Sequence, residues 1–168
     1  MCLALALVAA CSAPPPRPAG PSRETRERAY RANNAGVALL EQLKYPEAAA
    51  AFRQALGIDP TLAIAHLNLS LALMYDQNMD EALKEAADAA ARMPEAPQPA
   101  YVLGLVARAQ NRNTDARTSF EKVRAIDGSD IGTNVNLAQI ALEDRRYDDA
   151  VMALQPIVER EPYHVTAS

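Results

Sequence analysis

Small and apolar residues recur along the chain at a fixed spacing of 34 residues. Ala48 is followed at this spacing by Ala82, Ala116 and Ala150. The same step relates Phe52, Ala86, Phe120 and Leu154, and then Pro60, Pro94, Gly128 and Pro162. Each period contains two stretches with helical spacing that are separated by turn residues. The pattern therefore predicts four consecutive copies of one helix–turn–helix unit, without insertion or deletion.

One segment of the second copy, HLNLSLALM, has two possible interpretations. Leucines alternate at positions 67, 69, 71 and 73, which taken alone favours a β-strand. The segment has no β-branched residue, however, and it aligns with helical stretches in the other copies. We predict a helix that is apolar on two faces. Leu69 and Leu73 would lie in the core, and a separate stripe would be formed by Ile64, Leu67, Leu71 and Met74.

The repeated segments resemble the tetratricopeptide repeat. NNAGVALLEQLKYPEAAAAFRQALGIDP carries the small and apolar residues of that repeat at Gly36, Leu39, Tyr45, Ala48, Phe52, Ala55 and Pro60. The resemblance implies an all-α fold, a right-handed superhelix (α-solenoid) of four repeats at 29–62, 63–96, 97–130 and 131–164. With an extended first helix, the domain would cover residues 23–164, and residues 165–168 would begin a truncated fifth repeat.

The physical role of two residue types follows from this pattern. The repeated alanines, from Ala48 to Ala150, would lie where the two helices of a unit approach each other, so that only a small side chain fits. Pro46 suits the first turn of a helix, where its missing N–H costs nothing. Pro60 and Pro94 would end the second helix of their units.

In tetratricopeptide repeat proteins the first helix of each unit lines a concave groove that holds peptides or partner proteins. The resemblance therefore implies a protein or peptide partner and a largely apolar binding groove formed by Tyr30, Asn33, Val37, Ile64, Leu67, Asn68, Leu71, Tyr75, Tyr101 and Leu105. Further groove positions are Arg108, Val135, Gln139 and Leu142. The alternative is that these side chains only pack against neighbouring units.

One subclass of the family grips a terminal carboxylate with Lys, Arg and Asn side chains. Of the residues at those positions here, only Asn68 matches. Asn33, Val37, Gln98 and Val102 replace the others. We therefore do not expect a carboxylate clamp.

The N-terminal segment predicts a membrane anchor. Residues 1–10 suit a signal peptide, and VAAC, residues 8–11, resembles the lipobox of bacterial lipoproteins, in which the cysteine is acylated after cleavage. Cys11 would then be the lipid anchor, and residues 11–22 a Pro-rich tether. This implies a lipoprotein of the bacterial cell envelope, in the periplasm or on the outer membrane. Because no Lys or Arg precedes the apolar run, an ordinary cleaved signal, or no signal, remains an alternative.

Composition excludes several other classes of function. The net charge of −4 and a pI near 5.2 argue against nucleic acid as a partner. Cys2 and Cys11 are the only cysteines, so the repeats cannot contain a disulfide. His66 and His164 have no metal-ligand spacing, and no catalytic motif is present. We therefore expect no enzyme activity, no catalytic residue, no metal site and no cofactor, and we assign His66 a packing or surface role.

The sequence thus predicts a membrane-tethered scaffold for protein–protein interactions. The rival hypothesis is the N-terminal recognition arm of a larger secreted enzyme or β-propeller protein. Val151, Leu154, Ile157 and Val158 would leave the last helix uncovered, which predicts fraying or self-association through the C-terminal repeat and a longer natural chain. Pro156 is expected to interrupt that helix.

Overall fold

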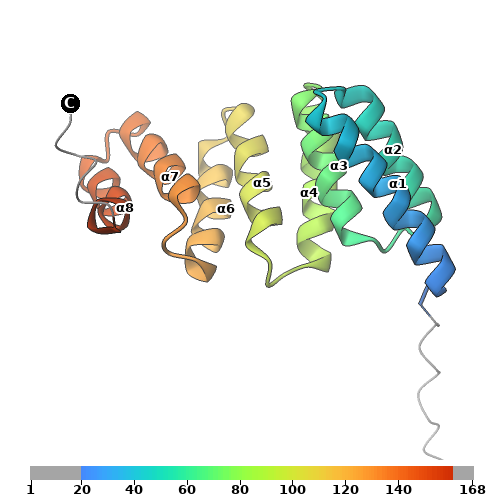
Figure 1. Cartoon of the computed structure of the whole chain (residues 1–168). Coiled ribbons are helices and arrows are strands. Elements are labelled where there is room, and N and C mark those ends of the chain that lie inside the picture. Colours follow the sequence, from blue (N-terminus) through green and yellow to red (C-terminus); the bar gives the residue numbers. More distant parts are fainter. Residues whose placement is uncertain (1–19, 161–168) are drawn as a thin grey trace, which may run out of the picture.

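The computed structural model describes residues 20–160, which form eight α-helices and contain no β-strand. The helices follow one another in chain order as four antiparallel pairs (Figure 1). Their bounds are α1 Arg23–Glu41, α2 Tyr45–Ile58, α3 Ala63–Tyr75, α4 Met79–Arg92, α5 Pro97–Ala109, α6 Asn113–Ile126, α7 Ile131–Glu143 and α8 Tyr147–Arg160. The fold is an all-α solenoid, as predicted. Cys11, the signal segment and residues 161–168 lie outside the described residues.

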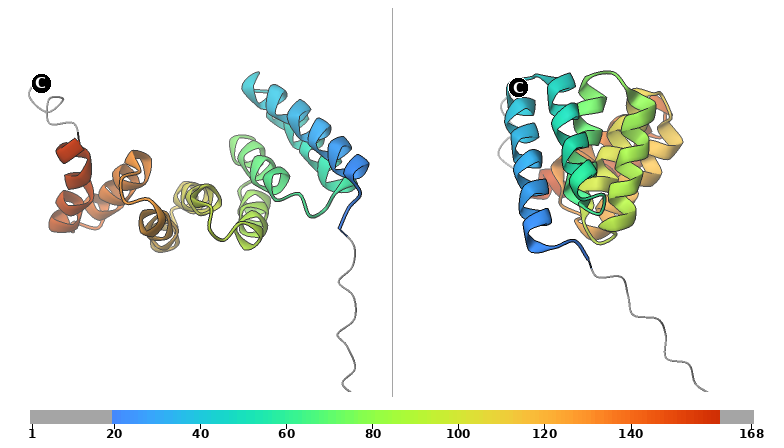
Figure 2. Two further views of the ribbon diagram at one scale, coloured as in Figure 1. Left: turned by 60° about the horizontal axis from the view of Figure 1, so that its bottom comes forward. Right: turned by 90° about the vertical axis from the view of Figure 1, so that its right-hand side faces the viewer.

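Successive helix pairs stack side by side along the molecule. Each helix packs against its neighbours in the chain, and α3 also touches α1 and α5 (Figure 2). Each predicted repeat thus contains one helix pair, while α1 begins before the first repeat. Within residues 20–160, no helix combines the length and the apolar character that crossing a bilayer requires.

Two side-chain caps and one proline mark the starts of three helices. The Ser22 side chain accepts a hydrogen bond from the Thr25 backbone N–H at 3.1 Å and so caps α1. Pro46 lies in the first turn of α2, as predicted. Asp130 caps α7 by accepting a bond from the Thr133 N–H at 2.6 Å.

The turn inside each pair has a common backbone feature that the sequence analysis missed. Leu43, Gln77, Asn111 and Arg145 have φ values of 60°, 65°, 58° and 58°, and they stand one period apart. This left-handed conformation reverses the chain between the two helices of a unit. It disfavours most side chains, but Asn tolerates it. Only Asn111 therefore gives a local signal for the turn.

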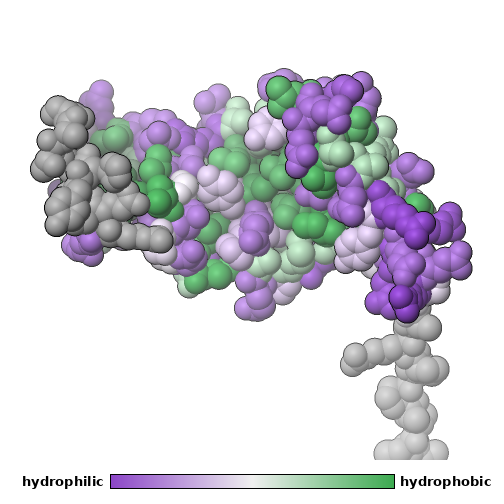
Figure 3. Space-filling view, viewed as in Figure 1, coloured by the Kyte–Doolittle hydropathy of each residue, from purple (hydrophilic) through white to green (hydrophobic). Residues whose placement is uncertain are grey.

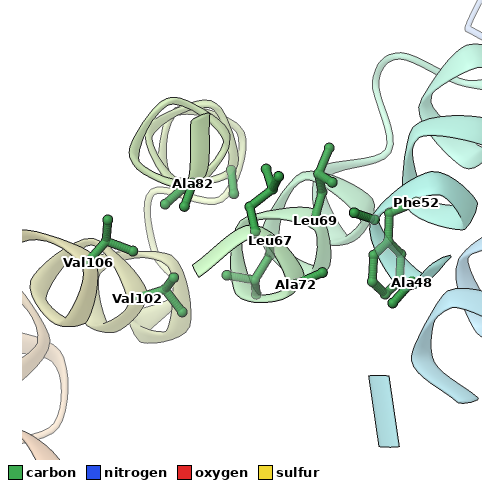
Figure 4. Packing of buried hydrophobic residues seen from close by; sticks show 12 residues of the cluster. Ala48, Phe52, Leu67, Leu69, Ala72, Ala82, Val102 and Val106 are labelled. Carbon is green, nitrogen blue, oxygen red and sulfur yellow. The ribbon is translucent and has the colours of Figure 1, made fainter. Parts of the chain in front are cut away.

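The core is built around the repeated alanines. Ala48, Ala82 and Ala116 are fully buried and Ala150 is 3% exposed, as expected for small residues packed between helices. The HLNLSLALM segment lies in α3 and is helical, as predicted. Leu69 and Leu73 are buried in the central core, which joins α2, α3, α4 and α5 (Figure 4).

The prediction that Pro156 interrupts the last helix is wrong. α8 runs from Tyr147 to Arg160 with Pro156 inside it. The lost backbone bond would have joined the nitrogen of residue 156 to the carbonyl of Met152, a residue that is 67% exposed. Water can reach this part of the helix and replace the missing donor.

Candidate binding groove

A hollow of about 530 Å³ opens between α3 and α5. Leu67, Leu71 and Tyr75 line it from α3, and Tyr101 and Leu105 line it from α5. All five were among the ten groove residues predicted from the sequence. Hydrophobic residues gather over α3–α5 at the centre of the face shown in Figure 3. We call this hollow the α3–α5 groove.

The five lining residues project from helices at helical spacing. Leu67, Leu71 and Tyr75 are four residues apart along α3 and therefore lie on one face, as do Tyr101 and Leu105 along α5. Leu67 is only 6% exposed and forms part of the wall, in contact with the central core, whereas Tyr75 is 50% exposed at the rim. The groove thus has an apolar base and an accessible aromatic edge.

Aromatic contacts position the two tyrosines. Tyr75 stacks on Tyr45, with ring centroids 5.2 Å apart. Tyr101 meets the edge of Phe120 at 5.7 Å. These contacts hold both rings in place before any partner binds, and they tie the groove to α2 and α6.

The phenol of Tyr101 remains protonated near neutral pH. Burial, and next the Asp130 carboxylate, raise the pKa of Tyr101 above its usual value of 10.0, while a hydrogen bond with Asn136 acts in the opposite direction. A Cβ on Gly132 would lie 2.6 Å from the Tyr101 hydroxyl oxygen, so the glycine makes room for this group. Tyr101 therefore presents an apolar ring with one neutral polar end.

One end of the groove is acidic. Asp127 and Asp130, from the turn between α6 and α7, belong to its lining. Both carboxylates also order that turn, since Asp127 accepts bonds from the N–H and hydroxyl of Ser129, and Asp130 accepts from the Thr133 N–H. Their place in the groove depends on the folding of α6 and α7 against α5.

The other predicted groove residues lie outside this hollow. Asn33 is buried, with 4% exposure, and accepts a hydrogen bond from Asn68 at 2.9 Å, which joins α1 to α3. Val37 and Ile64 pack against the central core, and Tyr30 is 48% exposed on α1.

The predicted positions further along the chain connect α5 to α7. Arg108 donates hydrogen bonds to Asn136, Gln139 and Glu143. Val135 is half-buried, and Leu142 is 49% exposed on α7. Arg108 and Gln139 thus bind each other across the array, outside the α3–α5 groove.

Several lining residues were not predicted as groove residues. Pro97, Gln98 and Val102 line the groove from α5, and Val123 does so from α6. Gln98 and Val102 occupy the positions that would carry the carboxylate clamp. Their side chains carry no charge, so these clamp positions lie in the groove but lack the cations that grip a carboxylate.

The family model for the tetratricopeptide repeat matches residues 33–100 and 67–131, which together span more than half of the chain. The chain belongs to the tetratricopeptide repeat family. It matches none of the curated proteins with which it was compared.

Several solved structures are similar to this fold. A crystal structure of MamA matches with a TM-score of 0.76 at 19% identity, covering 82% of this chain and 80% of that one. The Sgt2 domain from Aspergillus fumigatus matches with a TM-score of 0.68 at 21% identity, covering 79% of this chain and 87% of that one. The second domain of human RPAP3, in complex with the HSP70 peptide SGPTIEEVD, matches with a TM-score of 0.66 at 18% identity. The match covers 69% of this chain and 97% of that one.

Proposed function

We propose that this protein is a scaffold for protein–protein interactions, and that its α3–α5 groove binds an apolar segment of a partner protein. The observation that carries the proposal is the apolar and aromatic lining contributed by Leu67, Leu71, Tyr75, Tyr101 and Leu105. Apolar residues around a few convergent polar groups are typical of binding hollows. Membership of a family whose relatives include a peptide complex supports the same function.

The charge of the groove narrows the class of partner. Asp127 and Asp130 repel acidic segments and attract Lys or Arg at one end of a bound chain. Asn68, the one residue that matches the carboxylate clamp, is already bound to Asn33. The preferred segment is therefore apolar or aromatic with a basic residue near one end, in contrast to the acidic peptide carried by the RPAP3 structure.

Selection from a random peptide library displayed on phage tests this proposal. The expected result is a set of sequences with two or more large apolar residues and a flanking Lys or Arg, and Asp130→Asn should weaken their binding. Enrichment of peptides that end in acidic residues, or no enrichment over an unrelated helical protein, would contradict it.

The proposal extends to the location of the scaffold. Acylation of Cys11 would hold the protein on an envelope membrane of a bacterium, and residues 12–22 would separate the repeats from the lipid surface by about 3 Å per residue. VAAC, after an apolar run, supports this part of the proposal. Cys11→Ser should move the protein from the detergent phase to the aqueous phase after Triton X-114 separation. An unchanged partition would contradict the lipid anchor and leave the groove proposal intact.

A further inference from the structure

Three side chains with metal-binding atoms meet between α3 and α4. His66 projects from α3, and Glu85 and Asp88 project from α4. Their nearest ligand atoms all lie within 4.8 Å of one another. His66 Nδ1 is 2.6 Å from Glu85 Oε2, and the two side chains are only 11% and 12% exposed. None of the three lines the α3–α5 groove.

The other ring nitrogen of His66 has a donor role. His66 Nε2 lies 3.2 Å from the carbonyl oxygen of Pro60. Two periods later, Asn134 occupies the position of His66 and donates its side-chain N–H to the carbonyl of Gly128, the equivalent of Pro60, at 3.0 Å. Because a carbonyl only accepts, Nε2 carries a proton in this arrangement. In a neutral ring, the lone pair of Nδ1 then faces Glu85.

The cluster holds more negative charge than the histidine alone can satisfy. Glu85 and Asp88 are three residues apart on one face of α4, and both are partly buried. Among the described residues, no hydrogen bond or ion pair reaches Asp88. An imidazolium at His66 would satisfy Glu85 but leave Asp88 unpaired. A divalent cation placed between the three ligand atoms would satisfy all of them.

We propose that His66, Glu85 and Asp88 form a binding site for a divalent transition-metal ion, with Zn²⁺ as the best match. Zn²⁺ accepts imidazole nitrogen and carboxylate oxygen at about 2.0–2.2 Å, which places tetrahedral ligand atoms about 3.4 Å apart. The ion would replace the 2.6 Å contact between His66 and Glu85, with a small outward shift of the Glu85 carboxylate. Water would fill the fourth position.

One contact orients His66 as a metal ligand requires, and the sequences of the other repeats indicate that the cluster is not a by-product of the repeat. The bond from His66 Nε2–H to the Pro60 carbonyl is the kind of outer contact that orients metal-binding histidines. The other repeats have Ala or Asn in place of His66, Ala or Ser in place of Glu85, and Gln, Lys or Pro in place of Asp88. The fold therefore does not require this combination. The bound ion would join α3 to α4 within the repeat that supplies half of the groove.

Calorimetric titration with ZnCl₂ tests the site in the full chain, with Cys2→Ser and Cys11→Ser introduced to remove competing thiols. We expect one bound ion at the cluster and a thermal transition that rises with Zn²⁺ concentration. His66→Asn should weaken binding at least about tenfold. This variant keeps a donor for the Pro60 carbonyl, as Asn134 shows for Gly128. Asp88→Asn should weaken binding similarly, while Glu47→Gln, at an exposed carboxylate on α2, should leave it unchanged.

Amide spectra recorded with Co²⁺ locate the ion. Signals near residues 66 and 85–88 should shift or broaden first, and His66→Asn should abolish this effect. Zn²⁺ binding that His66→Asn and Asp88→Asn both leave intact would overturn the proposal. So would the absence of binding at these residues up to about 0.1 mM metal, in which case the cluster is a hydrogen-bonded histidine–carboxylate pair only. Neither result bears on the groove, which is tested with peptides.

Discussion

Gly104 on α5 lies directly against the ring of Phe120 on α6. A Cβ at Gly104 would come within 2.5 Å of Phe120 Cε1. Gly36 has the same relation to Phe52 two repeats earlier. In the second and fourth repeats the corresponding pairs are Ser70 with Ala86, and Ala138 with Leu154. A glycine thus faces a phenylalanine in the first and third repeats, and a larger residue faces a smaller partner in the second and fourth.

Gly104→Ala should destabilise the fold by about 1–3 kcal/mol, because the new methyl group has no space and Phe120 is fully buried. The matched control is Gly57→Ala in α2, where nothing lies within 4 Å of the added Cβ. That change should stabilise the helix by about 0.5–1 kcal/mol. Urea unfolding followed by circular dichroism measures both.

A double variant separates this contact from a general effect of alanine. Gly104→Ala combined with Phe120→Leu imitates the Ala138 and Leu154 pair of the fourth repeat. It should recover part of the stability that Gly104→Ala loses, so that the two effects are not additive. Equal stability of Gly104→Ala and the unmodified chain would show that the close approach is not tight.

The left-handed turn residues give a reciprocal prediction. Asn111→Leu should destabilise the protein by about 1 kcal/mol, because a leucine pays a larger steric cost at φ near 58°. Leu43→Asn should stabilise it by a similar amount, and Leu43 is 69% exposed, so little packing is lost. The midpoints of urea unfolding measure both changes in stability. Shifts of the same sign for both substitutions would rule out the backbone as their cause.

The last helix should be less stable locally than the equivalent helix in the middle of the array. Within the described residues, α8 packs mainly against α7, whereas α4 packs against both α3 and α5. Val151 and Met152 on α8 are each 67% exposed. Amides of residues 148–160 should therefore exchange with solvent faster than those of 80–92. Equal protection in a protein shown to be monomeric by ultracentrifugation would contradict this expectation.

The sequence predicted the solenoid well because small residues recur with the period of the repeat, at positions that are buried between helices. Ala48, Ala82, Ala116 and Ala150 specify helix contacts by size alone, and alignment with the other copies resolved the ambiguous leucines of α3. The left-handed turn was missed because Leu43, Gln77 and Arg145 do not signal it, and only Asn111 does.

The candidate sites depend more strongly on tertiary structure. Five predicted groove residues converge because they repeat along α3 and α5, but the acidic end comes from the α6–α7 turn, whose place beside α5 is not evident from local spacing. The cluster of His66, Glu85 and Asp88 was missed for a similar reason. Its ligands stand on two helices, and only the packing of α3 on α4 brings them together.

Binding of a phage-selected peptide to groove variants, measured by fluorescence anisotropy, tests the central claim most directly. Leu71→Lys places a charge in the apolar groove and should weaken binding at least about tenfold, or 1.4 kcal/mol. Tyr75→Ala, at a half-exposed position, is the milder second variant and should also weaken it. Val151→Lys and Tyr147→Ala repeat these changes at exposed positions of α8 and should leave affinity unchanged. If both groove variants remain folded by circular dichroism and bind as tightly as these controls, the α3–α5 groove is not the binding site.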